Sequence, residues 1–313
     1  MSGPVSADDV PAVATTDDAA VCEIEILDGR RAEVGGFEVH RVLPRRARRT
    51  VGAWCFVDHM GPGSVTDERG LDIGAHPHIG LQTVTWLLAG ELLHRDSLGS
   101  EQVIRPGQLN LMTAGRGVSH SEETTGVYTG EVHGVQLWVA QPDATRDGES
   151  AFEHHAELPP SALDAGGATV LVGDFGGTSS PARRDTDHVG VDLDLRSGRT
   201  VLPLDASFEH ALVVFEGSLA VGGRPLEPGH LGYLGLGRDE VPLDVAGSCR
   251  ALLIGGLPFP DPLLMWWNYV ARTREEITVA HRDWLAASDR FGRVTSPLER
   301  IVTPGPPWAA TTT

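Results

Sequence analysis

Four side chains that often bind transition metals occur as two short pairs with the same spacing. His76 and His78 form the first pair, and His120 and Glu122 form the second. On a β-strand, residues i and i+2 point to the same face, so each pair can present both side chains to one side of a sheet. Three imidazoles and one carboxylate suit a first-row transition metal such as iron better than calcium or magnesium. The spacing therefore predicts a metal site where two strands meet.

The residues around each pair favour this interpretation. Pro77 lies between the first two histidines, and because it cannot donate to a β-ladder it belongs on an edge strand or a bulge. The second pair follows a glycine-rich turn at 115–117. An isolated His-x-His is as often structural as ligating. The presence of a second pair, in a β-rich chain with many glycine turns, favours metal binding over a purely structural role for these histidines.

Short apolar runs separated by glycine turns must position these side chains. Regular short strands without intervening helices are typical of a β-sandwich or barrel. A meander between the two pairs can bring the second pair back beside the first. The predicted strands of this half lie at 22–27, 37–43, 81–88, 91–96, 101–104, 109–113 and 131–140.

The second half of the chain repeats the first half without its ligands. The segments that begin at Thr83 and at His210 share one order: apolar strand, glycine turn, strand, Pro-Gly and strand. The second copy has no histidine at 202–204 and no His or Glu pair at 241–243, where the first copy has its two pairs. We therefore expect His210 and His230 to be structural.

These patterns divide the chain into an all-β pair of domains with a short helix near the end. The helix is predicted at 273–287, with an aromatic cluster before it that we expect to pack between domains. A polar connector at 141–165 carries His154 and His155, which we expect on the surface. The predicted parts are a disordered acidic tail at 1–20, a metal-binding barrel at 21–150, a second barrel with its helix at 165–290 and a flexible tail at 291–313.

Composition excludes several classes of function. With 43 acidic and 25 basic residues the formal net charge is −18, so direct binding to nucleic acid is not expected. The arginine-rich segment 41–49 is interpreted as a solvated loop or edge strand paired with acids. The chain has no lysine, which excludes a Schiff-base or P-loop lysine. Three widely spaced cysteines, no signal peptide and no apolar run near ~18 residues predict a cytoplasmic protein that does not cross a membrane.

The string HPHIGLQTVTWLLAGE, preceded by Gly70 and FVDHMGPG and followed by MTAGRGVSHSE, resembles the pirin family of the cupin superfamily. This resemblance implies two tandem cupin barrels of the jelly-roll kind, of which the first binds a metal and the second is degenerate. It implies Fe(2+) at His76, His78, His120 and Glu122, with manganese, nickel, cobalt and copper left open. Many pirins and other cupins have a Glu where this chain has Gln82, so hydrogen bonding near the metal is expected to differ.

The resemblance implies two main functions. Bacterial pirins are associated with quercetin 2,3-dioxygenase activity, so the first is the opening of a flavonol-like substrate by O2, with Glu122 as a ligand and as the base for the substrate hydroxyl. The second is a redox-responsive regulator, as in animal pirins, whose iron state alters binding to a protein partner; segment 41–49 is the candidate face. A third alternative is a cupin isomerase or a plain small-molecule binder.

Overall fold

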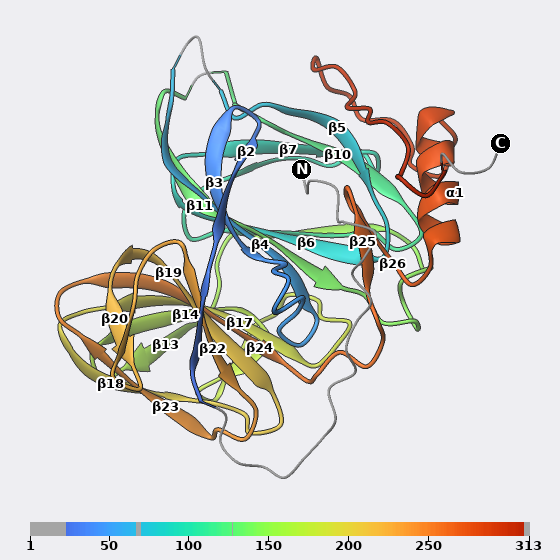
Figure 1. The fold of residues 1–313 in the computed structure, drawn as a ribbon. Coiled ribbons are helices and arrows are strands. Elements are labelled where there is room, and N and C mark those ends of the chain that lie inside the picture. The colour runs from blue at the N-terminus through green and yellow to red at the C-terminus, as the bar shows by residue number, and fades with distance from the viewer. Residues whose placement is uncertain (1–22, 67–69, 127, 310–313) are drawn as a thin grey trace.

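Two β-barrels stacked on one another make up most of the molecule (Figure 1). The computed structural model describes residues 23–66, 70–126 and 128–309. Strands alternate with tight turns throughout, and a single helix, α1 (Arg274–Leu285), occurs in the described residues. The prediction of an all-β chain with two barrels and a short C-terminal helix is confirmed.

The first barrel consists of a seven-stranded and a four-stranded antiparallel sheet. The larger sheet has the order β12-β9-β6-β11-β4-β3-β2, and the smaller has the order β5-β10-β7-β8. The bounds are β2 Arg30–Val34, β3 Phe37–Leu43, β4 Trp54–Val65, β5 Ile73–His78, β6 Leu81–Ala89, β7 Leu92–Asp96, β8 Glu101–Ile104, β9 Leu109–Thr113, β10 Val118–Glu123, β11 Gly130–Ala140 and β12 Ala151–His155.

The second barrel has the same two-sheet plan. Its sheets have the orders β1-β22-β19-β24-β17-β14-β13 and β18-β23-β20-β21, and a small hairpin, β15-β16, lies beside them. The bounds are β1 Glu25–Asp28, β13 Pro160–Leu163, β14 Gly166–Val172, β15 Asp174–Phe175, β16 Thr178–Ser179, β17 His188–Leu195, β18 Gly198–Pro203, β19 Glu209–Gly217, β20 Leu219–Val221, β21 Arg224–Leu226, β22 His230–Gly235, β23 Glu240–Val245 and β24 Cys249–Gly256.

The apolar runs of the central strands arise because these strands are buried on both faces. In β19, Val213 and Phe215 belong to a core that also contains residues of the first barrel, whereas Leu212 and Val214 face the interior of the second barrel. Trp54 of the first barrel is fully buried in the shared core, and its indole Nε1 donates to the carbonyl oxygens of two residues of the second barrel, at 3.1 Å each. One continuous core therefore joins the two barrels.

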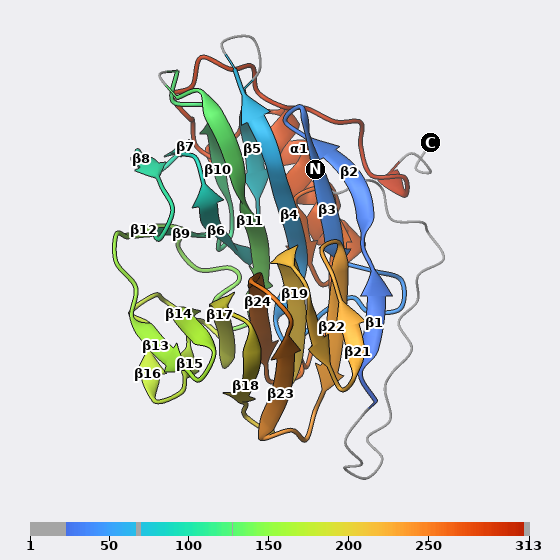
Figure 2. The ribbon, with the colours of Figure 1, turned by 90° about the vertical axis from the view of Figure 1, so that its left-hand side faces the viewer.

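Described segments near both ends of the chain lie in the other barrel, and this differs from the expected division. Strand β1 lies next to β22 in the second barrel's sheet, although the sequence placed it in the first (Figure 2). After β24, the hairpin of β25 (Leu264–Trp266) and β26 (Tyr269–Ala271) and the helix α1 return to the first barrel. There Tyr269 pairs with Ile79, and the aromatic cluster covers the outside of β5. The cluster therefore packs on the metal-binding barrel.

The connector predicted at 141–165 contains regular structure. Strand β12 pairs with β9 and holds both His154 and His155, which are half-buried and not on the open surface; His154 Nδ1 lies 2.7 Å from the Asn110 side-chain oxygen. The expected acidic tail at 1–20 lies outside the described residues. Of the segment expected as a C-terminal tail, Phe291 is buried and Trp308 packs against the same aromatic cluster.

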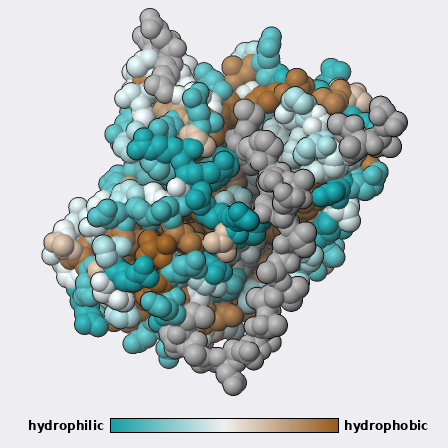
Figure 3. Space-filling model, in the orientation of Figure 1, coloured by the Kyte–Doolittle hydropathy of each residue, from teal (hydrophilic) through white to brown (hydrophobic). Residues whose placement is uncertain are grey.

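The described part of the chain contains no helix with the length and hydropathy needed to cross a membrane. Hydrophilic residues cover much of the face seen in Figure 3, with apolar residues gathered over part of the lower barrel.

Candidate metal centre

The two predicted ligand pairs lie on adjacent antiparallel strands. In the ladder between β5 and β10, His120 stands opposite His76 and Val118 stands opposite His78. The register then shifts, so that Glu122 pairs with Ile73. Such a bulge is a common device for re-aiming a side chain near a functional site. The four residues therefore lie in one small sheet, although they come from distant parts of the sequence.

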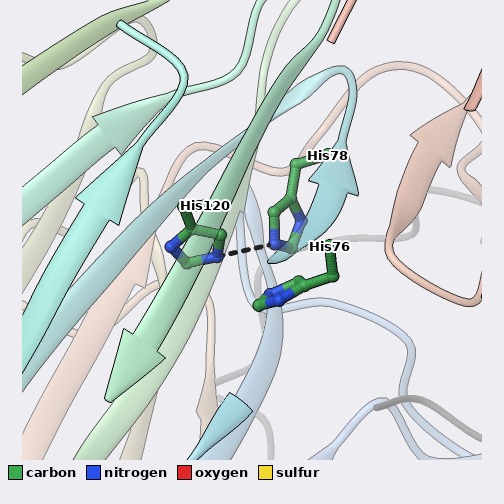
Figure 4. A group of neighbouring side chains, drawn as sticks. All are labelled: His76, His78 and His120. Atoms are coloured by element: carbon green, nitrogen blue, oxygen red, sulfur yellow. Dashed lines mark hydrogen bonds between the residues drawn. The ribbon is translucent and has the colours of Figure 1, made fainter. Parts of the chain in front are cut away.

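The three histidines converge on one point inside the first barrel. Each offers a ring nitrogen, and these nitrogens all lie within 4.8 Å of one another (Figure 4). The Nε2 atoms of His78 and His120 are 3.0 Å apart. Two nitrogens bound cis to one ion at about 2.1 Å would be about 3.0 Å apart, so this spacing fits a shared metal. All three rings are buried, with 7% of His76 exposed.

Backbone carbonyls orient two of the imidazoles. Nδ1 of His76 lies 2.9 Å from the carbonyl oxygen of Gly74, and Nδ1 of His78 lies 3.1 Å from that of Asn268. An Nδ1–H that donates to a carbonyl leaves the Nε2 lone pair for a metal. Asn268 belongs to the turn between β25 and β26, so the C-terminal segment helps to build the site in the first barrel.

The third imidazole is supported by a pair that the sequence analysis missed. Nδ1 of His120 lies 3.3 Å from Nδ1 of His94, and Nε2 of His94 lies 3.2 Å from a carboxylate oxygen of Asp96. The pair sits on β7, next to β10 in the sheet. If His94 donates from Nε2 to the carboxylate, its Nδ1 accepts from His120, whose Nε2 then faces the centre. The His-x-Asp spacing at 94–96 was the available signal, because it repeats the i, i+2 pattern of the ligand pairs.

Burial keeps the three imidazoles neutral. It lowers the pKa of His76 to about 4 and holds the pKa of His78 and of His120 well below the usual value. Neutral rings are the form that binds metals, so the centre is ready to accept an ion at neutral pH. Burial has the opposite effect on Glu122, because it raises the pKa of a carboxyl group.

Glu122 lines the same cavity as the three histidines, but its carboxylate oxygens lie outside the 4.8 Å group that the ring nitrogens form. As a fourth ligand it therefore stays a prediction. The cavity measures about 40 Å³. Since one water needs roughly 10–15 Å³ of this kind of volume, the space fits an ion and a few small molecules.

The cavity walls are aromatic and apolar with a few polar groups. Phe56 and Trp138 stack at 4.0 Å between ring centroids on one side. Asp58 also lines the cavity, and Nε of the buried Arg41 donates to its carboxylate at 2.7 Å. Arg41 was expected in a solvated segment; the structure instead places it in a buried ion pair beside the centre.

Gln82 does not line the cavity. Its side-chain amide donates to the Thr113 hydroxyl at 3.0 Å, between β6 and β9. Gln82, which stands where many cupins have Glu, therefore links two strands of the larger sheet and does not contribute a polar group to the metal cavity.

Two barrels of this plan, with three buried histidines on adjacent strands of one of them, define a two-domain cupin with a single candidate metal centre among the described residues. The pirin domain matches residues 36–139, and the pirin C-terminal cupin domain matches residues 190–292. The chain belongs to the pirin family.

Individual relatives agree over nearly the whole chain. The chain is 45% identical over 289 residues to "Putative quercetin 2,3-dioxygenase PA1205" of Pseudomonas aeruginosa, covering 91% of each protein. Human pirin is 28% identical over 283 residues, covering 86% of this chain and 94% of that protein. Among solved structures, a quercetin 2,3-dioxygenase from Acinetobacter baumannii superposes with a TM-score of 0.87 at 43% identity, covering 90% of this chain and 95% of that one.

A structure of the Escherichia coli pirin YhhW in complex with nickel(II) shares the fold, with a TM-score of 0.61 at 16% identity. The superposition covers 75% of this chain and the whole of the YhhW chain. The three-histidine site implies that this chain also carries a metal cofactor.

Proposed function

We propose that the protein is a mononuclear iron-dependent dioxygenase of the quercetinase type, which opens a metal-chelated flavonol or a similar enediol with O2. The observation that carries this proposal is the convergence of three buried, neutral imidazoles beside one carboxylate. With Fe(2+), this donor set leaves a net charge near +1, which favours an anionic chelating substrate. The names of the relatives at 45% and 43% identity support the same activity.

The chain's own residues would bind, orient and deprotonate the substrate. When bound, the metal supplies a Lewis acid and a template that holds the substrate and O2 together. Glu122 would take the proton of the substrate hydroxyl, and burial supports this role because it raises the pKa of the carboxyl group and makes the carboxylate a stronger base. The stacked rings of Phe56 and Trp138 form one apolar wall of the cavity.

The test is oxygen uptake by iron-loaded protein with quercetin, together with mass spectrometry of the product. We expect metal-dependent uptake, a ring-opened product and loss of both in His120→Ala. His230→Ala is the matched control, because this half-exposed histidine lies on the second barrel and pairs with Asp28. Uptake that persists in His120→Ala, or iron-loaded protein that consumes no O2, would overturn the proposal.

The volume of the cavity favours a second candidate. Sites for drug-sized ligands usually measure ~300–1,000 Å³, whereas this one measures about 40 Å³. A flavonol would enter only if side chains such as Met60 moved aside. A centre with so little free volume instead suits a redox-sensing regulator whose iron state alters the binding of a protein partner.

Segment 41–49 offers less surface for this role than its sequence suggests. Arg41 is buried, and Arg48 lies over the ring of Tyr233 and contacts Glu25. A pull-down with ferrous and with ferric protein tests the regulator hypothesis. Recovery of different partner proteins supports it, and recovery of the same partners contradicts it.

3-Hydroxy-4-pyranone, which keeps only the metal-chelating edge of a flavonol, separates the dioxygenase from the regulator. If it changes the metal's absorption spectrum and is consumed with O2, the centre is catalytic.

A further inference from the structure

The second barrel contains a cavity larger than that of the metal centre. It measures about 260 Å³ and lies at one end of the barrel. An engineered apolar cavity of ~150 Å³ is large enough to bind benzene. This one can therefore hold a substituted aromatic ring. The residues that matter here are the aromatic Phe175 and Phe208, the apolar Val189 and Leu253, and the polar Asp205 and His210.

The cavity occupies the position in the second barrel that the metal site occupies in the first. The sequence repeat aligns Thr83 with His210. In the first barrel Trp138 pairs with Thr83 and with Phe56. In the second barrel Gly255 pairs with His210 and with Val189. The ladder registers therefore place Val189 where Phe56 stands and Gly255 where Trp138 stands.

These replacements explain the extra space. In the first barrel the two stacked aromatic rings fill the region beside the metal. Val189 is smaller than Phe56, and Gly255 has no side chain, so the imidazole of His210 can lie over it. A Cβ added at Gly255 would stand 2.4 Å from Cδ2 of His210. The second barrel lacks the histidines of the metal site and has a larger cavity at the same place.

One buried polar side chain lines this cavity, that of His210. His210 is 1% exposed, and the backbone of Phe208 hydrogen-bonds to its ring. Burial lowers the pKa of His210 to about 4, so the ring is neutral at pH 7. A neutral imidazole has one nitrogen that donates and one that accepts, so the ring can also pair with a polar group of a ligand. A hydroxyl can satisfy either tautomer, since it can both donate and accept.

Charges at the entrance disfavour an anionic ligand. Arg184 is paired with Asp174 at 2.8 Å, which neutralises its charge. Asp205 accepts from the backbone N–H and the hydroxyl of Ser207, and these bonds lower its pKa, so it stays ionised. The three charged groups together leave a net negative charge beside the cavity.

From the cavity, its aromatic walls, the buried imidazole of His210 and the negative entrance, we propose that the second barrel binds a small, neutral, hydroxylated aromatic compound of the phenol class. The aromatic ring of the ligand lies between Phe175 and Phe208 and contacts Val189 and Leu253. The hydroxyl group of the ligand hydrogen-bonds to His210. This site is separate from the metal centre and does not depend on the proposed dioxygenase activity.

Fluorine NMR of three matched probes with the full-length, metal-loaded protein tests the proposal. The probes are 4-fluorophenol, 4-fluorotoluene and 4-fluorobenzoate, which differ only in the hydroxyl, methyl or carboxylate group. We expect saturable binding of 4-fluorophenol, weaker binding of the toluene and the weakest binding of the benzoate. Absence of saturable 4-fluorophenol binding, or a preference for the benzoate, would overturn the proposal.

Three variants locate the binding. Val189→Phe places in the second barrel the side chain that the first barrel has at the equivalent position, Phe56. It should abolish 4-fluorophenol binding by filling the cavity. His210→Phe keeps an aromatic ring but removes the hydrogen bond, so the phenol should bind about two- to tenfold more weakly and lose its advantage over the toluene. His76→Ala removes a metal-site histidine and should leave phenol binding unchanged.

Thermal unfolding and unchanged metal content in Val189→Phe and His210→Phe show that these variants are folded. Binding that disappears in His76→Ala but persists in Val189→Phe would place the phenol at the metal and contradict the proposal.

Discussion

Each metal-facing imidazole is held by a second contact on its far side. The partners are the Gly74 carbonyl for His76, the Asn268 carbonyl for His78 and the His94 ring for His120. Such partners fix the tautomer and raise the basicity of a ligating imidazole. The convergence of the three histidines was predictable because i, i+2 spacing on strands is local. The partners were not, because they depend on which strands and turns become neighbours.

The contact between His94 and His120 gives a prediction about metal affinity. His94→Phe keeps the ring that stacks on Phe152 at 4.4 Å but removes the acceptor for His120. We expect metal affinity to fall by roughly 10–100-fold, measured by competition with a chromogenic chelator. Asp96→Asn should weaken binding in the same direction by a smaller factor. Unchanged affinity in His94→Phe would show that the contact does not support the metal.

At the scale of elements, the aromatic hairpin β25–β26 supports the metal-bearing strand β5. Its turn supplies the carbonyl that orients His78, and Tyr269 is fully buried against the first barrel. The sequence predicted a packing role for this cluster. It could not show that the cluster returns to the first barrel, because that depends on long-range topology and not on local pattern.

Two substitutions at Tyr269 separate packing from the hydroxyl group. Tyr269→Ala opens a cavity beside β5, and we expect it to lower the free energy of unfolding by about 3–5 kcal/mol and to weaken metal binding. Tyr269→Phe removes a buried hydroxyl without a partner among the described residues, so stability should stay equal or rise by up to about 1 kcal/mol. Chemical denaturation measures both. A loss in Tyr269→Phe as large as that in Tyr269→Ala would contradict this account.

At the scale of the whole molecule, the barrels share one core and exchange their terminal segments. Repetition of the strand and turn pattern predicted two similar barrels, because each apolar run and glycine turn is encoded locally. The crossing of β1 to the second barrel was not predicted, because an alternating strand does not specify its neighbour. The exchange implies that the barrels depend on each other for stability.

Buried neutral histidines predict an acid-labile fold. Burial lowers the pKa of His59 to about 3 and those of His188 and His210 to about 4, against about 6.5 in the unfolded chain. Between pH 4 and 6.5 the unfolded state therefore binds more protons, so stability is full above pH 6.5 and falls as the pH decreases. If the unfolded state binds three more protons than the folded state, the free energy of unfolding falls by about 4 kcal/mol for each pH unit.

Denaturant midpoints at pH 7, 6 and 5 check this prediction. His188→Asn should reduce the slope of stability against pH by one proton. A stability that is constant or rises between pH 6.5 and 5 would show that the buried rings are not neutral in the folded state.

The central claim is that His76, His78 and His120, with Glu122 beside them, hold one metal ion. Elemental analysis of the as-purified protein tests this claim. The variants to compare are His76→Ala, His78→Ala, His120→Ala and Glu122→Gln, with His230→Ala as the control. We expect about one transition-metal ion per chain in the wild-type protein and in His230→Ala. We expect loss of the metal in each of the three site-histidine variants and reduced metal content in Glu122→Gln. A metal-free unaltered protein, or full metal content in His120→Ala, would contradict the account.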